Sequence, residues 1–117
     1  MVTVTVAAFD YVTLSIRNYH DSGNVVSLRS PLAVASAFFD RVGRFEAAAT
    51  IAGFSLSPLA VASVPELNPT IAHLRNVLGD GTYETFARHG EAMSMAKIVT
   101  FVYNQIDQAR TELEQLR

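Results

Sequence analysis

The chain has 117 residues, half of them apolar and 17% charged, which is long enough for one domain with its own core and too apolar for a disordered tail. It has no cysteine, which excludes disulfides, thiolate nucleophiles and zinc–thiolate sites. The formal net charge is −2 and the nine Lys and Arg residues are scattered, whereas a nucleic-acid interface needs a basic stripe, so we expect no nucleic-acid partner.

The N-terminal part predicts two helices. Residues 2–6 alternate Val and Thr with the period of a strand, but from Ala7 the apolar residues recur at steps of three and four. We therefore favour a helix to about Asp21, with its first few residues frayed. Ser30-Pro31 predicts a second helix ending at Gly43, because Ser caps free amides and Pro fits a first helical turn. Residues 24–30 are either a short helix or the start of this one.

The middle of the chain predicts short helices separated by turn signals. A helix from Phe45 to about Gly53 follows Gly43 directly, and two short helices joined by one glycine form an αα-hairpin. Ser57-Pro58 begins about one further helical turn. Residues 30–36 and 57–63 carry the same heptapeptide, Ser-Pro-Leu-Ala-Val-Ala-Ser, but the residues after each copy differ, so we interpret this as a local similarity.

Three helices are expected in the remainder. Asn68-Pro69 opens a helix that stops at Gly79, Thr82 caps one that ends at Gly90, and Ser94 opens the longest, which reaches about Leu116. The apolar residues of this last helix recur at steps of three and four, which predicts a seam for a neighbouring helix. If its last turns lack a neighbour within the chain, we expect them to form a surface for a partner protein or for a second copy of the chain. The residues of this surface would be Ile106, Ala109, Leu113 and Leu116. The alternative is packing against the chain's own hairpins, which we favour for the first half of the seam.

Residues 37–48 resemble the turn of a tetratricopeptide-type repeat. That motif has glycine at the turn, an aromatic residue two positions later and alanine on the second helix, and Gly43, Phe45 and Ala48 occupy these positions. Gly43 permits the reversal of the chain, Phe45 fills the corner, and Ala48 lets the two helices approach closely.

Residues 71–94, with Gly79, Tyr83 and Gly90 at the core of the pattern, look like the end segment of bacterial LuxR-type and MalT-type signalling ATPases. Together with Ala49–Gly53, they are similar to the mycobacterial and actinobacterial group that adds a cyclase-like domain and a helical-repeat tail. The resemblance covers about residues 9–110 and implies a stand-alone or truncated copy of that tail. No phosphate-binding loop occurs in the chain, so ATP binding is not implied.

Catalytic and metal-binding patterns are missing from the sequence. The histidines, His20, His73 and His89, belong to three different predicted elements, and the carboxylates are not paired, so we expect no catalytic residue, no metal and no cofactor. The aromatic residues are more numerous than one small core needs. If two or three of Phe38, Phe39, Phe45, Phe54, Phe86 and Phe101 lie exposed on one face, they would form a site for a peptide or a partner helix.

These observations together predict one all-α domain over residues 1–117, built of antiparallel, tetratricopeptide-like hairpins and a long C-terminal helix. No segment has the pattern of a signal peptide or a membrane span, so we expect a cytoplasmic protein without a membrane partner. We expect a non-catalytic interaction domain that binds a protein or peptide segment. The alternative is a small ligand-binding helical bundle or an enzyme, which would need a deep pocket with convergent polar groups.

Overall fold

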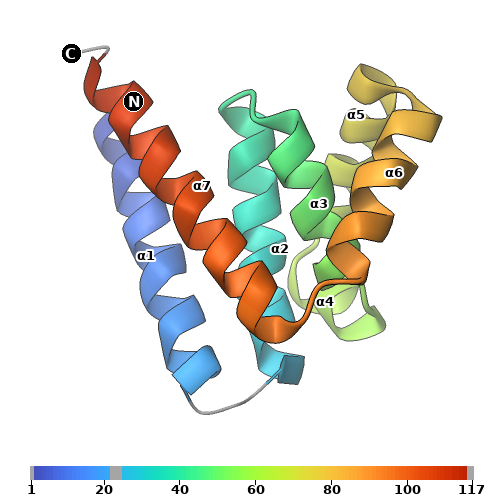
Figure 1. The fold of residues 1–117 in the computed structure, drawn as a ribbon, viewed down its shortest axis with the longest axis horizontal. Coiled ribbons are helices and arrows are strands. Elements are labelled where there is room, and N and C mark those ends of the chain that lie inside the picture. Colours follow the sequence, from blue (N-terminus) through green and yellow to red (C-terminus); the bar gives the residue numbers. More distant parts are fainter. Residues whose placement is uncertain (1, 22–24, 116–117) are drawn as a thin grey trace.

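The computed structural model describes the backbone of residues 2–21 and 25–115, and the side chains of 9–18, 28–58, 60–112 and 114–115. In this part of the chain every regular element is an α-helix, which confirms the all-α prediction. Figure 1 shows the helices in chain order: α1 (Val2–Asp21), α2 (Val25–Arg41), α3 (Phe45–Ser55), α4 (Pro58–Ser63), α5 (Leu67–Leu78), α6 (Asp80–Glu91) and α7 (Met95–Gln115).

Helix α3 is the centre of the structure. It packs most extensively against α6 and α2, and also contacts α5 and α7, while α1 covers α2 and α7 lies along α1 (Figure 1). Eight of the eleven residues of α3 are buried, and four of these are alanines. A helix that is apolar all round is typical of a buried central helix, and its small side chains let several neighbours approach closely.

The closest approach in the fold is between α3 and α6, at Gly53 and Gly90. A Cβ atom on Gly53 would clash with the backbone of Ala87, and one on Gly90 would clash with the backbone of Thr50. The predicted ends of these helices, near Gly53 and at Gly90, are correct to within two residues, because α3 ends at Ser55 and α6 at Glu91, so both glycines lie inside the last turn. Their role is to bring two helix backbones together where a side chain would hold them apart.

Several predicted helix starts also differ from the structure. Helix α2 begins at Val25, so residues 25–30 are its first part and Pro31 lies inside the helix. Helix α6 begins at Asp80 and not at the predicted cap Thr82. The reason is Gly79, whose φ of 86° and ψ of 151° suit glycine and reverse the chain at one residue, so that Asp80 can start the next helix at once.

Two serine caps are confirmed. The Ser57 hydroxyl accepts a hydrogen bond from the Ala60 amide at 3.1 Å, at the start of α4. The Ser94 hydroxyl accepts one from the Lys97 amide at 3.2 Å, at the start of α7. Both serines satisfy an amide that the first helical turn leaves free.

Candidate binding groove

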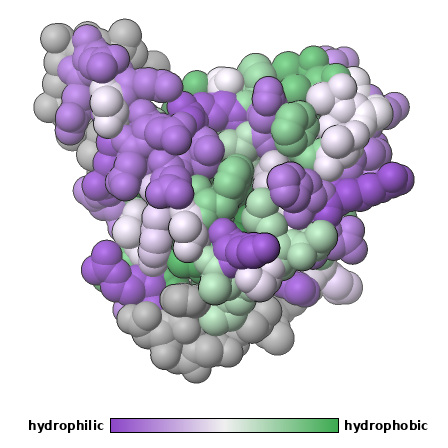
Figure 2. All heavy atoms as spheres, viewed as in Figure 1, coloured by the Kyte–Doolittle hydropathy of each residue, from purple (hydrophilic) through white to green (hydrophobic). Residues whose placement is uncertain are grey.

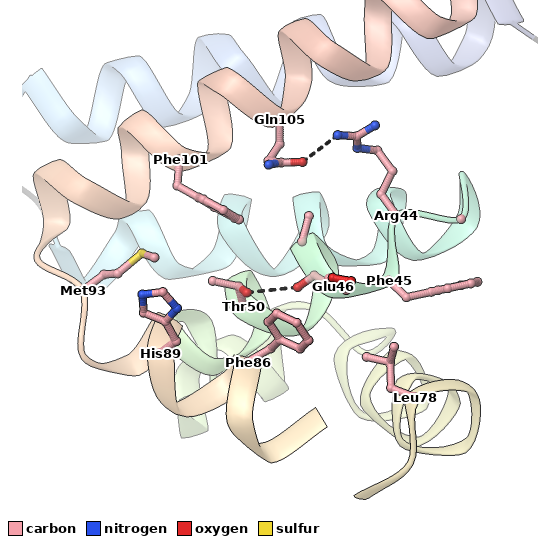
Figure 3. A pocket seen from close by; sticks show the side chains of 12 residues that line it. Arg44, Phe45, Glu46, Thr50, Leu78, Phe86, His89, Met93, Phe101 and Gln105 are labelled. Carbon is pink, nitrogen blue, oxygen red and sulfur yellow. Dashed lines mark hydrogen bonds between the residues drawn. The ribbon is translucent and has the colours of Figure 1, made fainter. Parts of the chain in front are cut away.

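A groove with a volume of about 670 Å³ lies between α6 and α7, with the N-terminal half of α3 as its floor (Figure 3). Helix α6 packs against α3 and α5, whereas α7 packs against α1 and α3, so the facing sides of α6 and α7 are left uncovered. Figure 2 shows hydrophobic residues between the hydrophilic outer side of α7 and α6. The residues that line the groove are Gly43, Arg44, Phe45, Glu46, Ala47, Thr50, Leu78, Phe86, His89, Met93, Phe101 and Gln105.

Three aromatic side chains from three helices reach this groove. Phe45 begins α3, Phe86 belongs to α6 and Phe101 to α7 (Figure 3). Each is half-buried, with one side packed on the core, and Leu78 and Met93 add further apolar surface. A concave site with mostly apolar lining and a few polar groups is typical of a binding site, and the flexible thioether of a methionine adapts to different partners.

The polar residues of the groove lie around this apolar surface. His89 is exposed on the last turn of α6, and Gln105 faces the groove from α7 (Figure 3). Thr50 lies on the floor, where its hydroxyl donates to the carbonyl oxygen of Glu46 at 3.0 Å. That hydroxyl already uses its proton within the helix, so the exposed His89 imidazole and the amide nitrogen of Gln105, whose oxygen accepts from Arg44, are the groups that remain to contact a ligand.

Arg44 occupies one end of the groove, immediately before α3. Its guanidinium donates to the side-chain oxygens of Gln105, Gln108 and Glu112, each at 2.8 Å. The arginine side chain is only 17% exposed, whereas Glu112 is 65% exposed. One side chain in the connection between α2 and α3 therefore holds three residues of α7.

The turn and packing residues predicted around the first hairpin lie in the connection between α2 and α3 and in α3 itself. Gly43 has a φ of 84°, a conformation that favours glycine, and connects α2 to α3. The Phe45 ring lies edge-on to His73, with centroids 5.9 Å apart. Ala48 is fully buried, and its carbonyl oxygen accepts a hydrogen bond from the buried Ser36 hydroxyl at 2.8 Å, so α2 and α3 are in close contact.

The residues predicted for the second segment, 71–94, have different roles in the structure. Gly79 provides the turn between α5 and α6, and Gly90 provides the contact with α3 described above. Tyr83 is buried, with the Arg75 guanidinium over its ring at 4.5 Å from the centroid. Burial of this phenol raises the pKa of Tyr83, against the opposing effect of the Arg75 charge.

The predicted partner surface on the last helix is not exposed where the structure describes it. Ile106 and Ala109 are each 2% exposed and belong to the chain's own core. The ion pair between Arg110 and Asp10 joins the same part of α7 to α1. This corrects the partner-surface prediction at Ile106 and Ala109, while the side chains of Leu113 and Leu116 lie outside the described residues.

The groove itself could be found only in part from the sequence. Phe45, Phe86 and Phe101 belong to the aromatic set expected to form a partner site, and Phe39 and Phe54 belong to the core instead. No pattern in the sequence indicates a site at His89 and Gln105, because their proximity depends on where α6 and α7 lie relative to each other. A short connection between two helices predicts that they pack together, but these two each pack on α3 and leave the groove between them.

Comparisons of the chain with protein-family models, with curated proteins and with solved structures give no match. Within the described residues, no group of three or more His, Asp or Glu side chains is placed to hold a metal ion. In the same part of the chain, no helix is both long enough and apolar enough to cross a membrane. We therefore infer a function from the geometry of the groove.

Proposed function

We propose that the chain is a non-catalytic interaction domain that holds an amphipathic helix of a partner protein in the groove between α6 and α7. The observation that carries the proposal is that Phe45, Phe86 and Phe101, from three helices, line a groove whose two walls do not pack against each other. A partner helix would bury these half-exposed rings and complete the packing around α3. Burial of aromatic side chains is a major source of binding energy at such interfaces.

The chemistry of the groove favours a helix over an extended peptide. Floor and walls are helices, whose backbone groups are bonded within each helix, so they offer no strand edge to a peptide. An extended segment would bury its own amides against apolar rings without hydrogen-bond partners, which costs free energy. A helix satisfies its backbone internally and presents apolar side chains at positions i, i+3 or i+4, and i+7.

Helix α6, one wall of the groove, is as long as such a helix. Helix α6 has 12 residues, which corresponds to about 18 Å at the rise of an α-helix. A partner helix of about three turns has the same length and places two or three anchor side chains on one face. The resemblance to the helical tails of LuxR-type and MalT-type signalling ATPases agrees with this role, and a tetratricopeptide-like arrangement and a cytoplasmic location are parts of the same proposal.

A small-molecule site is the second candidate, and one observation favours it. The volume of about 670 Å³ falls within the range of small-ligand pockets, roughly 300–1,000 Å³. An uncharged, largely apolar ligand would fit the three rings, with His89 and Gln105 as its polar contacts. The two candidates differ in the size of the ligand and not in the position of the site.

The test is to select helical peptides of about 16 residues, four turns, from a random displayed library, and to measure their affinity for purified variants. His89→Trp would fill the groove from an exposed position without removing a core contact. We expect this variant to weaken binding at least about tenfold. The matched control is Tyr11→Ser, which removes an aromatic side chain 66% exposed on α1, and should leave the affinity within about twofold.

Circular dichroism and thermal melts of both variants show whether the fold is retained. If no peptide is enriched, or if the selected peptides bind the His89→Trp variant as tightly as the wild type, the partner-helix proposal is wrong. If small apolar fragments bind in the groove and peptides do not, the second candidate replaces it.

A further inference from the structure

The position of α7 relative to α6 determines how wide the groove is. The two helices are joined at one end by the short connection 92–94, and each packs on α3 independently of the other. Figure 1 shows that α7 runs away from α6 as it leaves this connection, so the two helices are farther apart at the other end, which we call the wide end. The contacts that hold α7 at that wide end therefore control the shape of the site.

Arg44 is the contact that holds the wide end on the groove side. Its three acceptors, Gln105, Gln108 and Glu112, lie at steps of three and four residues and so form one stripe of α7. From Gln105 to Glu112 the stripe extends over seven residue steps, or about 10 Å along the helix axis. On the opposite side of α7, the Arg110–Asp10 ion pair joins the helix to α1.

The chemistry of this contact requires an arginine. A guanidinium carries five N–H donors in a rigid plane, and here it serves three acceptors at 2.8 Å from a side chain that is 17% exposed. Lysine carries the same charge on a single, strongly hydrated ammonium and lacks the planar fork. Hydrogen bonds from a charged donor are stronger than neutral ones, and the part-buried bond to Gln105 is the one best protected from competition by water.

We propose that Arg44 is a latch that fixes α7 at the wide end of the groove and thereby keeps the site in one binding-competent shape. Release of the latch frees the side of α7 that faces the groove, while the apolar face of α7 stays packed on the core through Ile98, Val102 and Ile106. The effect on groove width is independent of what binds there. The expected loss of affinity rests on the proposed function, because a site that is no longer pre-organised costs more free energy to order on binding.

The experiment measures the distance between α6 and α7 in the free protein by double electron–electron resonance between two spin labels. The chain has no cysteine, so a pair introduced at the exposed positions Arg88 and Asp107 carries the only two spin labels. We expect Arg44→Met to broaden the distance distribution at least about twofold, and Arg44→Lys to broaden it to an intermediate extent. The matched control is Arg41→Met, which removes an equal charge from an exposed ion pair with Glu66 and should change nothing.

A second variant keeps the test valid if Arg44→Met does not fold. Gln108→Ala combined with Glu112→Ala removes two acceptors from exposed positions of α7 and leaves the core intact, so it should broaden the same distribution. A distribution that stays as narrow as the wild type in both variants would overturn the latch. If the distribution broadens and no peptide is enriched against the wild type, the latch stands and the partner-helix function fails.

Discussion

The contact between α3 and α6 gives the sharpest stability prediction, because it depends on two missing side chains. A Cβ atom added to Gly90 would lie 2.7 Å from the carbonyl carbon of Thr50 and closer still to its oxygen. One added to Gly53 would lie 2.6 Å from the Cα atom of Ala87. Carbon atoms normally approach to about 3.5–4.0 Å, so each substitution forces α6 away from α3 by on the order of 1 Å.

The cost can be worked out from two opposing effects. Overpacking in a core costs about 1–3 kcal/mol, and the upper part of that range applies because a backbone atom cannot rotate out of the way. Alanine is a better helix former than glycine by about 1 kcal/mol, which offsets part of this cost. We expect Gly90→Ala to lower the free energy of unfolding by about 2 kcal/mol, and Gly53→Ala to have a similar effect. The midpoint of thermal unfolding should fall by roughly 8 °C.

Gly81 provides a control in the same helix. A Cβ atom there meets nothing within 4 Å, and the residue is exposed in the first turn of α6. Gly81→Ala should therefore raise the free energy of unfolding by about 0.5–1 kcal/mol through helix propensity alone. Urea unfolding followed by circular dichroism measures all three variants. If Gly90→Ala and Gly81→Ala both stabilise the protein, α3 and α6 do not approach as described and the reasoning is refuted.

Two further predictions concern buried polar groups. Ser36→Ala removes the hydroxyl that joins α2 to the Ala48 carbonyl. In the same urea assay this variant should lower the free energy of unfolding by about 1 kcal/mol. An unchanged free energy would show that this hydrogen bond contributes nothing to stability. Burial raises the pKa of Tyr83, so above the ordinary tyrosine value of about 10 the folded protein binds more protons than the unfolded chain, and stability falls as the pH rises through that range. Tyr83→Phe should keep the stability at pH 7 and reduce this alkaline loss, which melts at pH 7 to 11 measure; an equally steep loss in the variant would assign it to another group.

The helices could be predicted from the sequence because their signals are local. Ser57 and Ser94 cap the helices that they were expected to begin, and Gly43 makes the expected turn. Spacing at three and four residues also predicted a helix near the N-terminus. The expected fraying of its first few residues, where Val and Thr alternate, is wrong, because α1 is helical from Val2. These features depend on a few neighbouring residues, so a sequence pattern is sufficient to find them.

The candidate site could not be predicted in the same way, because it depends on contacts between distant residues. Glycine has two roles that look alike in a sequence, a turn or a close approach, and Gly53 and Gly90 proved to have the second. Arg44 contacts α7 residues more than sixty positions later. The sequence therefore pointed to the aromatic residues of the groove but not to the arrangement of helices that leaves them partly exposed.

Nuclear magnetic resonance tests most directly whether the groove between α6 and α7 holds a partner helix. The measurement is a titration of the labelled protein with the tightest selected peptide, following backbone amides and the aromatic rings. We expect the largest chemical-shift changes at Phe45, Phe86, His89, Phe101 and Gln105. We also expect nuclear Overhauser contacts between the peptide and the three aromatic rings. Shifts that centre instead on Tyr11 and Leu14, the exposed apolar residues of α1, would contradict the partner-helix proposal.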